Sequence, residues 1–459
     1  MSVHNHLQLT GRELVLRTLR HESVPLVPWV PFAGVHAGRL KGYSAQEVLT
    51  DENKLVESLV EANRLYSPDG QPVLFDLQIE AEILGCDLLW AEKAPPSVAS
   101  HPLADDPTIP TRLPEKSDGR LPLVLNAMRR VKAAVGDHTA LYGLVCGPFT
   151  LASHLRGTEI FMDMMLNPNL VHELTAYTLR VSRRVAEFYI EAGMDVIAIV
   201  DPMVSQIGPG HFVEFFSAAF TGLYDFLRDM NVPSSFFVCG DATKNIEPMC
   251  QTGPDCISID ENINLPAAKT ITDRYNITLG GNIPLTTVML LGTQQDNMKF
   301  ALDLLDSVDT HNLIVSPGCD MPYDVPPENT VGIGEALRNT AQVRAMLANY
   351  HAPELFDIEV ELPDYAHLEK PLIEVFTLDS DSCAACMYML GAAARGADEM
   401  AGRVDLVEYK FTERENVARC KKLGVKNLPS IYINGELVFS SIIPSAQELR
   451  AAIEKYLKR

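Results

Sequence analysis

The chain has 459 residues, 47% of them hydrophobic and 21% charged, a composition that suits a soluble globular protein large enough for two or three domains. Its 60 Asp and Glu residues outnumber 38 Lys and Arg residues, and the net charge of −22 makes nucleic acid and anionic membranes poor partners. No apolar run approaches the ~20 residues of a membrane-spanning helix, so we expect a cytoplasmic protein.

Strand and helix patterns alternate along the first three quarters of the chain. A helix is predicted to begin at Thr10, because Glu13 stands at capping-box spacing from it. Candidate strands lie at residues 27–31, 73–75, 140–145, 196–200, 235–238, 256–259, 277–279 and 313–315, and helical patterns at 124–135, 171–192, 211–228 and after Asn329. Eight strands separated by helices predict a (β/α)8 barrel, of class α/β, over residues 1–349.

Reactive side chains follow the candidate strands, which is where βα barrels carry their chemistry. In chain order they are His36, Asp76, Cys146, Asp201, Cys239, Asp260, Asn282 and Cys319. We take Asp76 and Asp201 as candidate catalytic residues, and His36, Arg39 and Asn282 as candidate substrate-binding residues. For Asp76 and Asp260 an equally good interpretation is that the carboxylate caps the next helix.

The nine cysteines are an odd number and are scattered, which favours reduced thiols over a secreted disulfide framework. Cys239 and Cys319 follow the fifth and eighth candidate strands, so the barrel would place both at one mouth. Two thiolates can hold a zinc ion. A buried, inert thiol is the common alternative for each.

A second domain follows a linker. Residues 350–371 contain three prolines and several acids without a sustained period, as a linker would. Residues 372–459 then predict strands at 374–378, 404–409, 428–433 and 437–439, the last two joined by an Asn-Gly turn, and helices at 413–423 and 445–457. Cys383 and Cys386 form a C-x-x-C motif that opens a further helix reaching about residue 394.

This second domain resembles thioredoxin- and glutaredoxin-like domains, in which strand, C-x-x-C, helix and Pro-hairpin follow in that order. The resemblance implies that Cys383 and Cys386 form a reversible disulfide and that Pro429 takes the place of the family's cis-proline. A helix N-terminus lowers a thiol pKa, so Cys383 is expected to be the attacking thiol. The alternatives are half of a zinc site or an adaptor domain without redox activity.

The barrel resembles the uroporphyrinogen decarboxylase superfamily in the blocks FDLQIEAEILGCDLLW, CGPFTLASHLRG, AGMDVIAIVDPMVSQIGPGHF, LGGNIP and SPGCDMPYDVPPENT. More narrowly, it is similar to the zinc-dependent methylcobamide:thiol methyltransferases. That branch holds zinc through a His-x-Cys pair and a distant second Cys, which implies Cys239 and Cys319 as ligands and about one zinc per chain. The chain departs from this pattern at Phe237, which stands where the family has His and cannot bind metal.

The replacement ligand stays open from sequence, with His36, His211, Asp241, Glu80 and Glu82 as candidates. The resemblance implies transfer of a methyl group between a corrinoid, carried by a partner protein, and a small-molecule thiol or related acceptor. Dimers are common in that family. The alternatives are a uroporphyrinogen decarboxylase, disfavoured because Arg39 stands alone where the decarboxylases use several arginines, and a non-catalytic corrinoid- or tetrapyrrole-binding protein.

Overall fold

A single parallel sheet builds the first domain of the computed structural model, which describes residues 9–351, 358–380, 384–441 and 443–457. The sheet order is β1-β4-β5-β6-β7-β8-β9 and every neighbouring pair is parallel. Its strands are β1 (Gly70–Leu74), β4 (Ala140–Cys146), β5 (Val196–Val200), β6 (Ser234–Phe237), β7 (Cys256–Ser258), β8 (Thr278–Ile283) and β9 (Leu313–Pro317). The carboxyl ends of all seven strands therefore lie on the same side of the sheet.

The predicted first strand at residues 27–31 is not a strand, and this is a correction. Trp29 makes only an isolated parallel bridge to Val315 of β9. On the other side, the Trp29 carbonyl accepts a hydrogen bond of 2.9 Å from the Asp69 amide beside β1. The segment thus closes the sheet between β9 and β1. Pro28 and Pro31 have no amide hydrogen to donate, which explains why no regular ladder forms there.

Helices separate the strands, as the alternating pattern predicts. The Thr10 capping box opens the first helix, because the Thr10 and Glu13 side chains each satisfy a free backbone amide of the other residue. The helices of this domain are α1 (Gly11–Leu19), α2 (His36–Arg39), α3 (Ala45–Thr50), α4 (Glu52–Tyr66), α5 (Ile79–Ile83), α6 (Leu121–Val135), α7 (Pro148–Arg156), α8 (Glu159–Leu166), α9 (Pro168–Glu191), α12 (Ile246–Gln251), α13 (Leu265–Arg274), α14 (Gln294–Ser307), α15 (Pro327–Arg338) and α16 (Thr340–Met346).

The predicted helix at 211–228 is observed as three consecutive pieces, α10 (Pro209–His211), the π-helical η2 (Phe212–Phe216) and α11 (Ser217–Asp229). Shorter segments are η1 (Pro202–Gln206), η3 (Thr243–Asn245) and η4 (Leu285–Leu290), and a small antiparallel pair joins β2 (Leu88–Leu89) and β3 (Ser97–Val98). Sequence reasoning did not predict this small pair, whose two strands are only two residues long.

Apolar side chains fill the inside of the barrel. Val30, Phe32, Phe75, Tyr142 and Phe237 belong to one buried cluster, against which Cys239 and Cys319 pack from the strand ends. Burial of such side chains contributes ~2 kcal/mol each, so the interior is a packed core rather than a channel. The open chemistry of the barrel must therefore lie above this cluster, at the strand ends.

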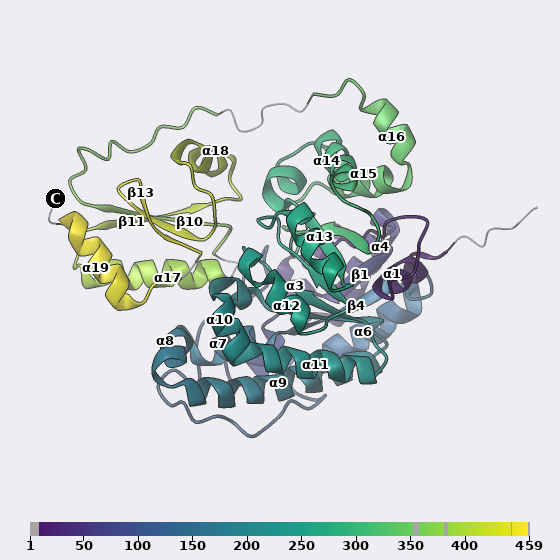
Figure 1. Cartoon of the computed structure of the whole chain (residues 1–459), viewed down its shortest axis with the longest axis horizontal. Helices are drawn as coiled ribbons and strands as arrows, with labels where there is room; N and C mark the ends of the chain where they lie inside the picture. The colour runs from purple at the N-terminus through teal and green to yellow at the C-terminus, as the bar shows by residue number, and fades with distance from the viewer. Residues whose placement is uncertain (1–8, 352–357, 381–383, 442, 458–459) are drawn as a thin grey trace, which may run out of the picture.

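The C-terminal domain is a four-stranded sheet of order β11-β10-β12-β13, with β10 (Leu372–Thr377) parallel to β11 (Asp405–Lys410) and antiparallel to β12 (Ser430–Ile433). β13 (Glu436–Ser440) completes the predicted hairpin. Helix α18 (Arg414–Leu423) covers one face of the sheet, and α17 (Ala384–Glu399) and α19 (Ala446–Leu457) cover the other (Figure 1). This arrangement agrees with the predicted thioredoxin-like fold.

Candidate active site at the barrel mouth

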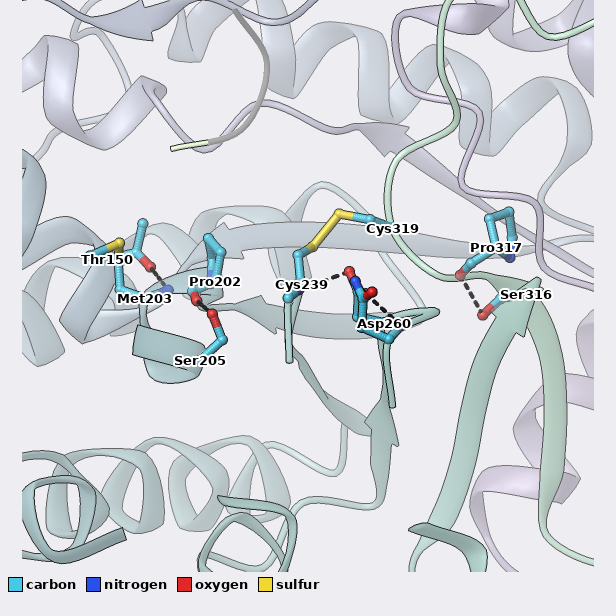
Figure 2. Close-up of a disulfide and its surroundings, with 11 residues drawn as sticks. Thr150, Pro202, Met203, Ser205, Cys239, Asp260, Ser316, Pro317 and Cys319 are labelled. Atoms are coloured by element: carbon cyan, nitrogen blue, oxygen red, sulfur yellow. Dashed lines mark hydrogen bonds between the residues drawn. A yellow bond between two sulfur atoms is a disulfide. The ribbon is translucent and has the colours of Figure 1, made fainter. Parts of the chain in front are cut away.

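Cys239 and Cys319 meet at the carboxyl ends of their strands, as the sequence predicts. Cys239 follows β6 and Cys319 follows β9, and the two residues form a disulfide with Cα atoms 5.8 Å apart (Figure 2). The structure thus differs from the expectation that all thiols are reduced. Both residues are half-buried, whereas Cys86, Cys146, Cys250, Cys256, Cys386 and Cys420 are buried.

The disulfide lines a cavity of about 510 Å³. Loops that follow β1, β4, β5, β6, β7, β8 and β9 contribute to its wall, and residues of the C-terminal domain complete it. Its charged side chains are mainly acidic, namely Asp260, Glu261, Asp320, Asp324 and Asp379, against Lys93 and Lys426. Lys93 is in turn paired with Asp324 at 2.8 Å. A cavity of this size and charge suits a small ligand better than a polyanion.

A hydrogen-bonded loop after β7 stands beside the disulfide. The Asp260 carboxylate accepts hydrogen bonds from the Gly240 amide at 2.7 Å and from the Asn262 side chain at 2.6 Å (Figure 2). Gly240 is the residue next to Cys239, so Asp260 fixes the backbone that carries this sulfur. Burial raises the pKa of Asp260 and Glu261, and burial also raises the pKa of Asp320 well above its ordinary value.

Asn282 was predicted to bind substrate, but it does not line the cavity. Its side-chain amide donates hydrogen bonds to the carbonyl oxygens of Asp260 at 2.9 Å and Ile263 at 2.8 Å. Asn282 therefore supports the loop that carries Asp260, and its contact with a substrate stays a prediction.

Asp76 stays away from the cavity, and it does not cap a helix either. Its buried carboxylate lies 2.5 Å from the Arg120 guanidinium, which also pairs with Glu82 at 2.7 Å. The Arg120 guanidinium stands 5.0 Å from the centre of the Trp90 ring. Asp76 is therefore one member of a buried ion-pair network, which is a structural task.

Asp201 caps the start of α7. Its carboxylate accepts hydrogen bonds from the Phe149 amide at 2.9 Å, the Thr150 amide at 3.1 Å and the Thr150 hydroxyl at 2.6 Å. Burial raises the pKa of Asp201 to about 7. Asp201 itself does not line the cavity, whereas its partner Thr150 does. The helix-capping interpretation, given to Asp76 and Asp260 from sequence, thus describes Asp201.

His36 and Arg39 hold the loop that follows Cys319. The His36 Nδ1 donates to the Tyr323 carbonyl oxygen at 2.9 Å, and its Nε2 bonds to the Tyr66 hydroxyl at 2.6 Å. Burial lowers the pKa of His36 to about 4, so the ring is neutral. Arg39 donates to the Val325 carbonyl oxygen at 2.5 Å. Neither residue lines the cavity, and both hold the loop after Cys319; their substrate contacts stay a prediction.

Sequence reasoning missed four polar residues of the cavity wall. Within the described residues, Gln78 Oε1, His154 Nδ1, Gln206 Oε1 and Thr286 Oγ1 are buried atoms without a hydrogen-bond partner, and all four residues line the cavity. Unpartnered buried polar atoms cost free energy unless a ligand or water satisfies them. Gln78, His154 and Gln206 lie in sequence blocks that carry the family resemblance, and that was the available signal.

The zinc ion implied by the resemblance does not fit this site. Phe237 points into the barrel interior, where its ring centre lies 4.8 Å from that of Phe32 and 5.7 Å from that of Phe75. Cys239 and Cys319 are bonded to each other, and a disulfide has no thiolate to offer a metal. Across the described ranges, no group of three His, Cys, Asp or Glu side chains is placed to hold a metal ion. Hence none of the five replacement ligands completes a site.

The C-terminal domain brings its own motif to the cavity. Cys386 is buried, accepts a hydrogen bond of 3.4 Å from the Leu378 amide and lines the cavity, as does Pro429. The Leu428–Pro429 peptide bond is cis, in agreement with the thioredoxin-like resemblance. Cys383 lies outside the described residues.

Comparison with known proteins agrees with both halves of this description. Residues 10–339 match the uroporphyrinogen decarboxylase (URO-D) family, and residues 372–454 match a thioredoxin domain. The chain therefore belongs to the uroporphyrinogen decarboxylase family, and it carries a C-terminal thioredoxin domain. No helix in the portion we describe is both long and apolar enough to cross a membrane.

Individual relatives point to methyltransferases. The chain is 26% identical over 340 residues to the methylcobamide:CoM methyltransferase MtbA of Methanosarcina acetivorans, covering 72% of this chain and 98% of that protein. It is 29% identical over 266 residues to MtaA of Methanosarcina barkeri, covering 55% and 74%. A uroporphyrinogen decarboxylase of Anaeromyxobacter is 27% identical over 251 residues, covering 52% and 70%.

A solved methyltransferase structure from Methanosarcina mazei superposes on the barrel with a TM-score of 0.67 at 23% identity, covering 72% of this chain and 99% of that chain. This likeness supports the fold of the barrel.

Proposed function

We propose that this protein is a corrinoid-dependent methyltransferase, which moves a methyl group between a corrinoid carried by a partner protein and a small thiol or related acceptor. The observation that carries the proposal is the lining of the cavity, where the Cys239 and Cys319 sulfurs stand among five acidic side chains and two lysines of the described residues. An eight-carboxylate tetrapyrrole would need several cationic partners there, whereas a small thiol needs none. The methylcobamide:CoM methyltransferases among the relatives support the same reaction class.

The polar side chains of Gln78, Gln206 and Thr286 line the cavity and are the groups that we propose hold the substrate. The side-chain oxygens of Gln78 and Gln206 accept hydrogen bonds, and the Thr286 hydroxyl can donate one. A ligand with both donors and acceptors would satisfy them and so would be fixed in one orientation. Residues of the C-terminal domain form part of the cavity wall.

The thiolate is the nucleophilic form of a thiol, so the acceptor must lose its proton before it reacts. Asp260, Glu261 and Asp320 are the carboxyl groups of the inner cavity wall that can take up this proton. A methylcorrinoid supplies an electrophilic methyl group, to which the thiolate sulfur forms a new C–S bond as the cobalt–carbon bond breaks with both electrons staying on cobalt. Zinc is left out of this proposal because the residues present do not fit it.

The test is demethylation of methylcobalamin by a panel of small thiols, followed by the change in the corrinoid absorption spectrum. The protein is first reduced with a dithiol, which is then removed. We expect demethylation with at least one thiol, and a loss of ~10-fold or more, about 1.4 kcal/mol of transition-state stabilisation, in Cys239→Ala. Cys250→Ala is the matched control, since Cys250 is buried and does not line the cavity.

Two other outcomes are informative. Production of coproporphyrinogen from uroporphyrinogen, without demethylation for any thiol, would overturn the proposal in favour of a decarboxylase. Demethylation that occurs only when a corrinoid protein is added would support the proposal and assign donor selection to the docked partner.

A further inference from the structure

The barrel disulfide and a cysteine of the C-terminal C-x-x-C motif line the same cavity. Cys239 and Cys319 line it from the barrel, and Cys386 and Pro429 line it from the C-terminal domain. The disulfide is half-buried, and its exposed part faces this cavity. A reagent that reduces the disulfide therefore acts from this cavity, part of whose wall belongs to the C-terminal domain.

The two domains contact each other through a hydrogen bond and a contact between two rings. The Tyr388 hydroxyl donates a hydrogen bond of 3.3 Å to the Ser153 carbonyl oxygen of α7, and the Tyr388 and His101 ring centres lie 6.0 Å apart. Tyr388 is only 5% exposed and stands two residues after Cys386 on α17. The start of α17 is thus anchored at the barrel mouth, against α7 and η1.

Further contacts keep the domain in place. Arg414 of α18 donates a hydrogen bond of 3.4 Å to the Leu291 carbonyl oxygen of the barrel. On the far side, Lys422 and Arg419 donate to the carbonyl oxygens of Val360 at 2.6 Å and Glu361 at 3.2 Å, so the connecting segment packs along the domain. The Tyr388 and Arg414 contacts hold the C-terminal domain at the barrel mouth, so Cys386 and the disulfide of the same chain line one cavity at high effective concentration.

From this juxtaposition we propose that the C-terminal domain reduces the Cys239–Cys319 disulfide of its own barrel and thereby switches the barrel between a disulfide form and a dithiol form. One thiolate of the Cys383/Cys386 pair attacks one barrel sulfur, a mixed disulfide forms, and the other barrel sulfur leaves as a thiolate that takes up a proton. The second thiol of the pair loses its proton and attacks the mixed disulfide. The barrel gains two thiols as the pair becomes a disulfide.

Two electrons and two protons pass from the C-terminal domain to the barrel, and an external dithiol then reduces the C-terminal pair. The exchange does not depend on the methyl-transfer reaction, but it gives the proposed reaction a redox control, because only the reduced barrel presents thiols at the site. Among the described cysteines outside these pairs, Cys420 also lines the cavity. Burial raises the pKa of Cys420 to about 12, which makes its thiol a poor nucleophile.

The test follows individual cysteines of the full-length, oxidised protein by alkylation and mass spectrometry after one equivalent of dithiothreitol per chain is added. We expect the Cys239–Cys319 pair to open roughly tenfold or more faster in the wild type than in Cys383→Ser, because that variant lacks the thiol that is expected to attack within the chain. Cys420→Ser and Cys250→Ser are matched controls and should open at the wild-type rate.

A trapping variant gives positive evidence that a folding defect cannot mimic. In Cys386→Ser we expect a mixed disulfide between Cys383 and either Cys239 or Cys319, because the resolving thiol is absent. Equal opening rates in all variants, together with no cross-linked peptide, would overturn the proposal. The measurement contains no methyl donor, so its failure and the failure of the proposed function can be told apart.

Discussion

The two sides of the barrel mouth contrast in what their strand-end residues do. On the side of β1, β4 and β5, the reactive residues Asp76, Cys146 and Asp201 are buried and do not line the cavity. On the side of β6 to β9, Cys239, Asp260 and Cys319 line it, whereas Asn282 of β8 supports the Asp260 loop. All seven occupy the same kind of position in the sequence, after a candidate strand.

The difference lies in the partners that the rest of the chain supplies. Arg120 forms an ion pair with Asp76, and backbone amides in the first turn of α7 donate hydrogen bonds to Asp201. Both carboxylates therefore interact with partners inside the fold. The sulfurs on the other side are bonded to each other, pack on the apolar cluster of the barrel and line the cavity. Position after a strand thus makes a residue a candidate for the active site. The neighbouring side chains determine whether it is free to contact a ligand.

The largest effect should come from breaking the ion pair on the structural side. In Arg120→Met, the buried Asp76 loses its counter-charge, and we expect a loss of about 3–5 kcal/mol in the free energy of unfolding. Urea unfolding followed by tryptophan fluorescence measures it, since Trp29 and Trp90 both lie in the barrel.

Arg130→Met is the matched control. Arg130 also pairs with a carboxylate, Glu52, at 2.8 Å, but the pair is exposed, so the expected loss is below ~1 kcal/mol. If Arg120→Met kept wild-type stability while methyl transfer disappeared, Asp76 would belong to the reaction and the contrast between the two sides would be wrong.

Much of the fold was predictable because strand and helix periods are local properties. The strand at Val196–Val200 was predicted to the residue, and the hairpin of the C-terminal domain follows its Asn-Gly turn. The first candidate strand, at residues 27–31, was wrong because its apolar composition was given more weight than Pro28 and Pro31, which interrupt the ladder.

The site was less predictable because burial and partners are long-range properties. Chain order and barrel geometry correctly placed Cys239 and Cys319 together, although they are 80 residues apart. Nothing local to Asn282 shows that its amide will support the Asp260 loop, and nothing local to Asp76 shows that Arg120 will meet it. Likewise, the shared cavity depends on how the two domains pack against each other, and the linker sequence does not predict this packing.

The next effect concerns pH and Asp201. Its folded pKa of about 7 lies above the ordinary value of 3.8, because burial disfavours the charged carboxylate. Such a group stabilises the fold fully below pH ~4, and its contribution is lost as the pH rises through about 7, up to roughly 4 kcal/mol in all. Asp201→Asn should therefore flatten the decline of unfolding free energy between pH 4 and pH 7.

Asp229→Asn, at an exposed position that ends α11, is the control and should leave the pH profile unchanged. A profile of Asp201→Asn that runs parallel to that of the wild type would mean that Asp201 is charged in the folded barrel. A charged carboxylate at the mouth would then return Asp201 to the set of catalytic candidates and weaken the contrast between the two sides.

The smallest effect on stability, and the sharpest on metal binding, should come from Phe237→His on the functional side. Phe237 and Cys239 are two residues apart and face the same side of their strand, so a histidine would stand next to the sulfur. Replacing a ring that packs on Phe32 and Phe75 with a polar one should cost about 1–3 kcal/mol. In return, the reduced variant would offer a nitrogen and two thiolates, which is a zinc ligand set with one open position.

We expect elemental analysis after dialysis to find about one zinc per chain in reduced Phe237→His, and none in the reduced wild type or in the oxidised variant. Phe237→Gln is the control, because it introduces the same kind of polar burial without a metal ligand. Zinc retained by the reduced wild type, and lost in Cys319→Ser, would show instead that the native site already has a third ligand that the oxidised structure does not bring into place.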